Sequence, residues 1–216
     1  HRHLGGKANK ALRLAGAASF DEVYAAFLDE WSGDRSPVAG FDRRANALDL
    51  DIDQAAPHAV RIMYCDAVSY LPDDVLCKVD RASMAVGLET RVPFLDHRVA
   101  EVAARIPSEL KTQGRAGKHI LRQLLYRHLP EALFDRPKAG FAVPVGSWIR
   151  GPLRPWAEDL LDPARMAAEG WLDAAVVQRR WADHLSGRRD STVALWGILM
   201  FQAWLAGQRQ NVKLAA

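Results

Sequence analysis

LPDDVLCKVDRASMAVGLETRVPFLD, residues 71–96, contains the changes of backbone pattern from which the fold can be read. Pro72-Asp73-Asp74 interrupts an apolar, helically spaced run over 57–71, because proline inside a helix ends or kinks it. Asp73 or Asp74 can then cap a second helix, which continues to about Val86. Gly87–Leu95 alternates apolar and charged residues and is typical of an extended loop. The stretch therefore predicts a helix, a break, a second helix and an extended loop.

Helical spacing recurs on both sides of this stretch. Ser19 and Glu22 form a capping box for an earlier helix. Asp96 can cap a helix that continues to about Ile106, before Pro107. No clear β-strand pattern is present, so the expected fold is all-α. Further helices are expected at 117–129, 152–161, 173–185 and 191–206, with loops at 32–42, 111–117 and 134–146.

Composition excludes several classes of function. The 216 residues are 49% hydrophobic and 25% charged with a net charge of +3, an ordinary globular balance. So small a charge, without a basic stripe and interleaved aromatic residues, does not indicate a nucleic-acid partner. The apolar run Val193–Leu205 is too short for the roughly 20 residues that a bilayer needs. Two cysteines form no disulfide framework, which favours a cytoplasmic location without a membrane span.

Charged residues gather on the second helix of the opening stretch. Asp74, Lys78 and Arg81 share one helix face, with Asp80 displaced from it. This pattern is typical of a solvated stripe of ion pairs, and it is also compatible with a substrate-binding face.

Glu89 and Arg91 are two residues apart in the expected extended loop, so their side chains should project together. Because charges in an apolar setting are costly unless paired, we expect them to form a pair. The pair can be architectural, or it can recognise an α-amino and an α-carboxylate group.

The segment Arg136-Pro137-Lys138-Ala139-Gly140-Phe141 holds a lysine between a stiff and a permissive residue. Such a lysine can direct a point charge at a phosphate, or it can be an exposed loop residue. A Walker-type phosphate loop, a zinc-protease motif and a hydrolase nucleophile elbow are all missing from the sequence. The pattern alone predicts a helical domain with an anion-binding loop.

In order and spacing, these segments resemble the asparagine synthase domain family. Each segment is short, but together they cover about 80 residues in a fixed order, which makes coincidence improbable. They are Leu71–Asp74, Lys78–Met84, Gly87–Asp96, Gly117–Arg122, Leu129–Pro130 and Arg136–Phe141, followed by Pro144 and Trp148.

The resemblance implies an enzyme that uses ATP, with Mg²⁺, to convert a carboxylate into an acyl-adenylate, which ammonia then turns into an amide. In asparagine synthetases the carboxylate is aspartate, and the ammonia comes from glutamine in a separate N-terminal domain. The family's synthetase domain is an adenine nucleotide α-hydrolase-like α/β sheet with a helical C-terminal region. Its Ser-Gly-Gly-x-Asp-Ser pyrophosphate loop and its later Ser-Gly-x-Gly-x-Asp-Glu loop are not in this sequence. Residues 1–216 are therefore expected to be the helical part, with the α/β sheet portion absent.

The resemblance also implies roles for individual residues. Lys138 matches the family's lysine on the ATP phosphates and the leaving pyrophosphate, a catalytic role, and Arg136 and Lys118 are assigned to ATP binding beside it. The metal ligands are expected mainly in the missing part. The expected substrate-binding residues are Asp74, Lys78, Asp80, Arg81, Glu89 and Arg91.

The expected partners are small molecules and the remainder of the protein's own chain. Alone, the chain should be inactive, should bind ATP very weakly, and should form homo-oligomers through the face that otherwise meets the α/β sheet. Two alternatives stay open. One is a same-fold ligase that acts on another carboxylate, as in antibiotic or polysaccharide pathways. The other is a non-catalytic helical interaction module.

Overall fold

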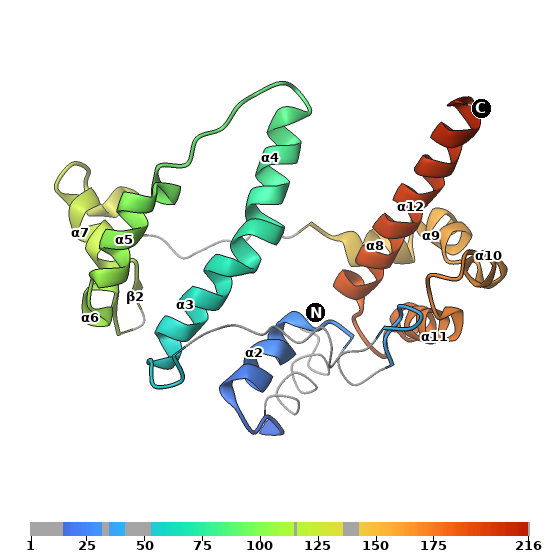
Figure 1. Cartoon of the computed structure of the whole chain (residues 1–216), viewed down its shortest axis with the longest axis horizontal. Coiled ribbons are helices and arrows are strands. Elements are labelled where there is room, and N and C mark those ends of the chain that lie inside the picture. Colours follow the sequence, from blue (N-terminus) through green and yellow to red (C-terminus); the bar gives the residue numbers. More distant parts are fainter. Residues whose placement is uncertain (1–14, 32–34, 42–52, 115, 136–142, 216) are drawn as a thin grey trace. The chain divides into compact units, whose positions relative to one another are not determined.

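The computed structural model describes residues 15–31, 35–41, 53–114, 116–135 and 143–215. The chain divides into two compact units, which are described separately. Unit 1 comprises residues 1–49 and 142–216, and unit 2 comprises residues 50–141. Most described residues are helical, which confirms the all-α prediction (Figure 1).

Unit 1 is a cluster of helices around one apolar core. Its longest helix, α12, packs against α8, α9 and α11. Leu161, Met166, Leu195 and Leu199 are fully buried in this core, and Trp181 is nearly so. The helices are α2 (Phe20–Leu28), α8 (Val145–Arg150), α9 (Arg154–Leu160), α10 (Pro163–Glu169), α11 (Ala174–Leu185) and α12 (Thr192–Ala215).

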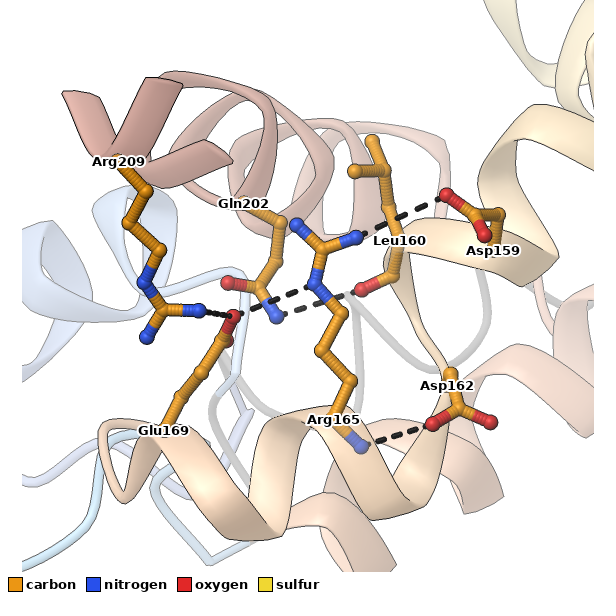
Figure 2. A network of polar contacts seen from close by, with 7 residues as sticks. All are labelled: Asp159, Leu160, Asp162, Arg165, Glu169, Gln202 and Arg209. Atoms are coloured by element: carbon orange, nitrogen blue, oxygen red, sulfur yellow. Dashed lines mark hydrogen bonds and ion pairs between the residues drawn. The ribbon is translucent and has the colours of Figure 1, made fainter. Parts of the chain in front are cut away.

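Polar contacts join α9 and α10 to α12 (Figure 2). Glu169, with a side chain only 3% exposed, accepts hydrogen bonds from Arg165 (3.2 Å) and from Arg209 of α12 (2.7 Å). Gln202, fully buried on α12, donates to the backbone carbonyl of Leu160 at 3.3 Å. Asp162 caps α10 by accepting from the backbone N–H of Arg165 at 2.7 Å. The network fixes the middle and later turns of α12 against its neighbours.

The helix ends in unit 1 follow the sequence signals in most places. Ser19 caps α2 by accepting from the backbone N–H of Glu22. The Glu22 carboxylate accepts from the N–H of Ala18, one residue earlier than in a regular capping box. Neither α8, which begins within the predicted 134–146 loop, nor α10 was predicted, and α12 continues to Ala215 beyond the predicted end at 206.

Unit 2 is built from shorter elements. Its helices are α3 (His58–Val68), α4 (Cys77–Met84), α5 (His97–Arg105), α6 (Ser108–Lys111) and α7 (His119–Tyr126), with the irregular turns η1 (Leu71–Leu76), η2 (Pro93–Leu95) and η3 (Glu131–Leu133). Two antiparallel two-residue strands, β1 (Thr112–Gln113) and β2 (Ala116–Gly117), lie in the predicted 111–117 loop. They are too short to alter the fold class.

The predicted break at Pro72 is wrong. Figure 1 shows α3, η1 and α4 following one another as a nearly continuous rod, and neither Asp73 nor Asp74 caps α4. The reason is that η1 is a π-helical segment, whose wider turn accommodates a proline that lacks an N–H. The Ser69 hydroxyl donates to the carbonyl of Cys65 at 2.6 Å, just before the irregularity.

Unit 2 exposes most of its large apolar side chains. Among its described residues only Arg61 and Cys65 are buried, whereas Met84, Val86 and Phe94 are between 54% and 80% exposed. The side chains that give α3, α4 and α7 their helical apolar periodicity are therefore largely unburied. Within the described ranges, no helix has both the length and the apolar character required to cross a membrane.

Candidate active site

A pocket of about 650 Å³ lies in unit 2, between α4 and the extended segment that leads into α5. Its volume is in the range of small-molecule sites. The lining is mainly apolar, with four polar residues. It consists of Leu76, Val79, Asp80, Thr90, Arg91, Val92, Pro93, Leu95 and Asp96.

Asp80 and Arg91 bring opposite charges to this one pocket. Asp80 projects from α4 and Arg91 from the extended segment, and both are among the predicted substrate-binding residues. No hydrogen bond or ion pair involves the Asp80 carboxylate among the described residues, so it is available to a ligand. A carboxylate and a guanidinium around a partly apolar hollow can bind the ammonium and carboxylate groups of an amino acid.

Glu89 and Arg91 form the predicted ion pair, through one hydrogen bond between the guanidinium and the carboxylate. Their environment differs from the expectation, because the two side chains are 70% and 77% exposed to solvent. Arg91 also donates to the backbone carbonyl of Thr90. Glu89 therefore contacts a residue of the pocket lining, Arg91, but is not itself among the lining residues.

Asp74 and Lys78 form the predicted pair at positions i and i+4, at 2.7 Å. This hydrogen bond raises the pKa of Lys78, against a smaller opposing effect of desolvation. Arg81 lies on the same helix and is exposed, and the three residues are not part of the pocket lining. Asp80 is the only charged residue of η1 and α4 that lines the pocket. The helical periodicity places it off the face shared by Asp74, Lys78 and Arg81.

Asp96 also lines the pocket, although the sequence predicts only a helix-capping role for it. It caps α5 by accepting from the backbone N–H of Arg98 at 2.9 Å, and its two oxygens accept from the Arg98 side chain at 3.0 and 2.7 Å. The side-chain hydrogen bonds, followed by the backbone one, lower the pKa of Asp96. Asp96 directly follows the predicted extended loop at 87–95. This position is the feature of the sequence that could have assigned it to the pocket.

Lys118 lies away from the pocket lining, between β2 and α7. Its backbone is left-handed, with φ of 61°, which is strained for a residue with a side chain. Its carbonyl accepts from the N–H of Arg122 in the first turn of α7. Arg136 and Lys138, the other residues assigned to ATP, lie outside the described residues.

The described residues do not offer a site for Mg²⁺, since no three histidine, cysteine or acidic residues among them gather as metal ligands. The pocket also has one cation, Arg91, which is already paired with Glu89. That donor set suits one carboxylate better than a triphosphate, so the pocket does not fit the phosphate end of ATP.

Comparison with known proteins identifies the class. The model of the asparagine synthase family matches residues 2–206, and the chain belongs to this family. Asparagine synthetase [glutamine-hydrolyzing] 1 of Bacillus subtilis (strain 168) is 32% identical over 144 residues, covering 67% of this chain and 22% of the relative. A protein of Mycobacterium bovis, provisionally named as a glutamine-hydrolysing asparagine synthetase, is 33% identical over 209 residues, covering 93% of this chain and 32% of the relative.

A third relative has a different name. Amidase chry2 of Gibberella zeae is 28% identical over 193 residues, which cover 83% of this chain and 27% of the relative. The chain thus spans about a third or less of the length of these curated relatives. No solved structure matches the chain.

Proposed function

We propose that this chain is the helical C-terminal part of an ATP-dependent ligase that amidates a carboxylate, and that this carboxylate is the side chain of aspartate. The observation that carries the proposal is the meeting of Asp80 and Arg91 in one pocket. Aspartate has one ammonium and one α-carboxylate, which match these two groups and leave its side-chain carboxylate to react. Membership of the asparagine synthase family supports the same reaction.

The reaction has two balanced steps. An oxygen of the substrate carboxylate attacks the α-phosphorus of ATP, and pyrophosphate leaves with the electrons of the broken P–O bond. Ammonia, supplied by hydrolysis of glutamine, then attacks the acyl carbon, and AMP leaves as one proton is lost from nitrogen. Mg²⁺ would accompany ATP, and a cytoplasmic location fits these reactants.

Each residue has a distinct proposed role. Asp80 binds the substrate ammonium, Arg91 binds the α-carboxylate, and Glu89 holds the Arg91 guanidinium in place. Lys138, with Arg136 and Lys118, neutralises the charge that develops on the phosphates as pyrophosphate departs. Asp74, Lys78 and Arg81 contribute the adjoining charged surface of the substrate site.

The test uses the complete protein in which this chain occurs. Pyrophosphate release is measured with aspartate, ATP, Mg²⁺ and ammonia for the wild type, Lys138→Ala, Asp80→Asn and Arg127→Gln. Arg127 is the control, because it is an exposed arginine outside the pocket. Lys138→Ala should lower kcat by about 100-fold or more, the scale of a lost electrostatic contact in the transition state. Asp80→Asn should mainly raise the KM for aspartate, by roughly tenfold or more.

Release that depends on aspartate and is lost in Lys138→Ala supports the proposal. A folded protein that releases no pyrophosphate with any carboxylate would refute it and leave the non-catalytic helical module as the better interpretation. Calorimetry gives a separate check, because the 216-residue chain alone should bind ATP only very weakly.

A ligase for another carboxylate is the second candidate, and the match to amidase chry2 is the observation that favours it. In that case a panel of carboxylates should give pyrophosphate release with a compound other than aspartate. The effect of Lys138→Ala would be the same, whereas Asp80→Asn would alter the KM only for substrates that carry an ammonium group.

A further inference from the structure

Asp96 is the most enclosed charged residue of the pocket in unit 2. It is half-buried, whereas Asp80 and Arg91, the other charged residues of the lining, are exposed. The side chain of Asp96 is 33% exposed, and that of its partner Arg98, which is not among the lining residues, is 79% exposed. The carboxylate is thus the enclosed member of this ion pair. Its charge is screened less by water than the other charges of the lining.

The hydrogen bonds of Asp96 leave part of its carboxylate open. Oδ1 accepts from the backbone N–H of Arg98 at 2.9 Å and from Nε of the same residue at 3.0 Å. Oδ2 accepts from Nη2 of Arg98 at 2.7 Å. The ring of His97 lies nearest to Oδ1, at 3.9 Å. Because an ionised carboxylate has about four acceptor positions, Oδ2 can accept a further hydrogen bond from a ligand.

The charged groups around the hollow have an excess of negative charge. The lining has two carboxylates, Asp80 and Asp96, and one guanidinium, Arg91. Glu89 is paired with Arg91, and Arg98 is paired with Asp96. The Asp80 carboxylate has no hydrogen bond or ion pair among the described residues, so its negative charge is the one left over. The pocket therefore attracts a positively charged group of a ligand and repels a second carboxylate at this position.

We infer that Asp96 is a specificity-determining residue: with Asp80 it binds the ammonium group of the substrate, so that the pocket selects amino acids over acids without an amino group. A primary ammonium has three N–H donors, one more than the two oxygens of Asp80. Asp96 Oδ2 supplies the third acceptor, and Arg91 takes the α-carboxylate. This inference rests on the proposed function for the reaction and adds the class of substrate that the pocket accepts.

The substitution Asp96→Asn separates the charge of this residue from its role as a helix cap. Asparagine caps helices about as well as aspartate does, so α5 should still begin at His97. The amide loses the negative charge that attracts an ammonium. Arg98→Gln is the matched control, because it removes the same ion pair from the other side and leaves the charge of Asp96 in place. A purely structural ion pair predicts the same result for both variants.

The first experiment measures pyrophosphate release by the complete protein with ATP, Mg²⁺, ammonia and L-aspartate. Succinate, which lacks the amino group, is added as a competing acid. Asp96→Asn should raise the KM for L-aspartate by about tenfold, the scale of one lost hydrogen bond between charged groups. The inhibition constant of succinate should stay within about twofold of the wild type or decrease. Arg98→Gln should leave both constants within about twofold.

The second experiment measures binding without the reaction. Isothermal titration calorimetry of the complete protein compares L-asparagine with succinamate. L-Asparagine has the ammonium and α-carboxylate groups of aspartate, and succinamate is the same molecule without the ammonium. The wild type should bind L-asparagine more tightly. The ratio of the two dissociation constants should fall about tenfold in Asp96→Asn and about twofold or less in Arg98→Gln.

Three results would overturn the inference. One is the same change in Asp96→Asn and Arg98→Gln, which would make the ion pair purely structural. Another is an equal change in Asp96→Asn for ligands with and without an ammonium group. The third is no change for either ligand in that variant.

Two measurements keep these outcomes separate from unfolding and from a failure of the proposed function. Circular dichroism melting verifies that each variant is folded, and Asp96→Ser, a second neutral helix cap, provides the same comparison. A wild type that releases no pyrophosphate with any carboxylate would refute the proposed function. The calorimetric ratio would still decide the role of Asp96.

Discussion

Asp80 and Arg91 are the residues with the strongest chemical argument, because they supply opposite charges to one hollow from separate segments. The two side chains differ in how many polar partners they already have. Arg91 is hydrogen-bonded to Glu89, whereas the Asp80 carboxylate has no hydrogen bond or ion pair among the described residues. A ligand ammonium would therefore gain a new partner at Asp80, while a ligand carboxylate would have to share Arg91 with Glu89. We expect selectivity for the ammonium group to be the sharper of the two.

The carboxylate of Asp96 provides a test of the pocket's electrostatics. Arg98→Gln removes the side-chain donors that lower the pKa of Asp96, so this pKa should rise toward its ordinary value near 3.8. The folded-state pKa lies below the unfolded value, so the stabilisation by Asp96 is present above that ordinary value and is lost as the pH falls through the folded-state pKa. NMR titration of the Asp96 carboxyl carbon measures the change. Arg105→Gln, on the same helix, should have no effect.

That prediction depends on the hydrogen bonds between Asp96 and Arg98 persisting in solution. An Asp96 titration curve that is the same in Arg98→Gln and in the wild type would show that they do not.

The sequence patterns predict charged pairs that are close in the chain, but they do not predict which residues of separate segments meet. The pairs Asp74–Lys78 and Glu89–Arg91 could be predicted because each depends only on local backbone period. The meeting of Asp80 with Arg91 could not, since it depends on how the extended segment folds back along α4. The ion pair of Arg122 with Asp135 was missed for the same reason: residues 13 apart share no local periodicity.

At the scale of the elements, the helix caps predicted at Ser19 and Asp96 form, whereas the cap predicted at Asp73 or Asp74 and the break predicted at Pro72 do not. Ser19, Asp96 and Asp173 each accept a backbone N–H where a helix begins. Pro72 predicts a stop because a regular helix cannot accommodate it, but the π-helical turn η1 can. The Ser69 hydroxyl donates to the carbonyl of Cys65 just before η1, a contact that a proline signal alone does not include.

The helix α12 gives the clearest prediction at this scale. Leu199 is fully buried in the core of unit 1, whereas the next residue, Met200, is 38% exposed. Leu199→Ala should lower the free energy of unfolding by about 2–5 kcal/mol, because it removes buried apolar atoms and leaves a cavity. Met200→Ala should change it by less than about 0.5 kcal/mol. Urea unfolding followed by circular dichroism measures both, and similar values for the two variants would contradict the assigned core.

At the scale of the whole molecule, apolar side chains are distributed unevenly between the two units. Unit 1 has an apolar core, so its helices stabilise one another. The described part of unit 2 has helices with the amphipathic spacing of packed helices, yet large apolar side chains along α3, α4, α5 and α7 remain exposed. Exposed apolar area of this extent marks an interaction surface. The curated relatives are at least about three times as long as the matched region. We propose that the corresponding additional chain of the complete protein covers the exposed apolar side chains of unit 2.

The isolated 216-residue chain should therefore self-associate through unit 2. On α7, Leu121 and Leu124 are 41% and 53% exposed, and replacing both with lysine should shift the chain toward the monomer in size-exclusion chromatography with light scattering. Gln123→Lys adds charge to the same helix without removing apolar area, so it should shift the distribution much less. A wild-type chain that stays monomeric across a wide concentration range would contradict this account. It would mean that the apolar side chains of unit 2 are covered within one molecule and are not a docking surface.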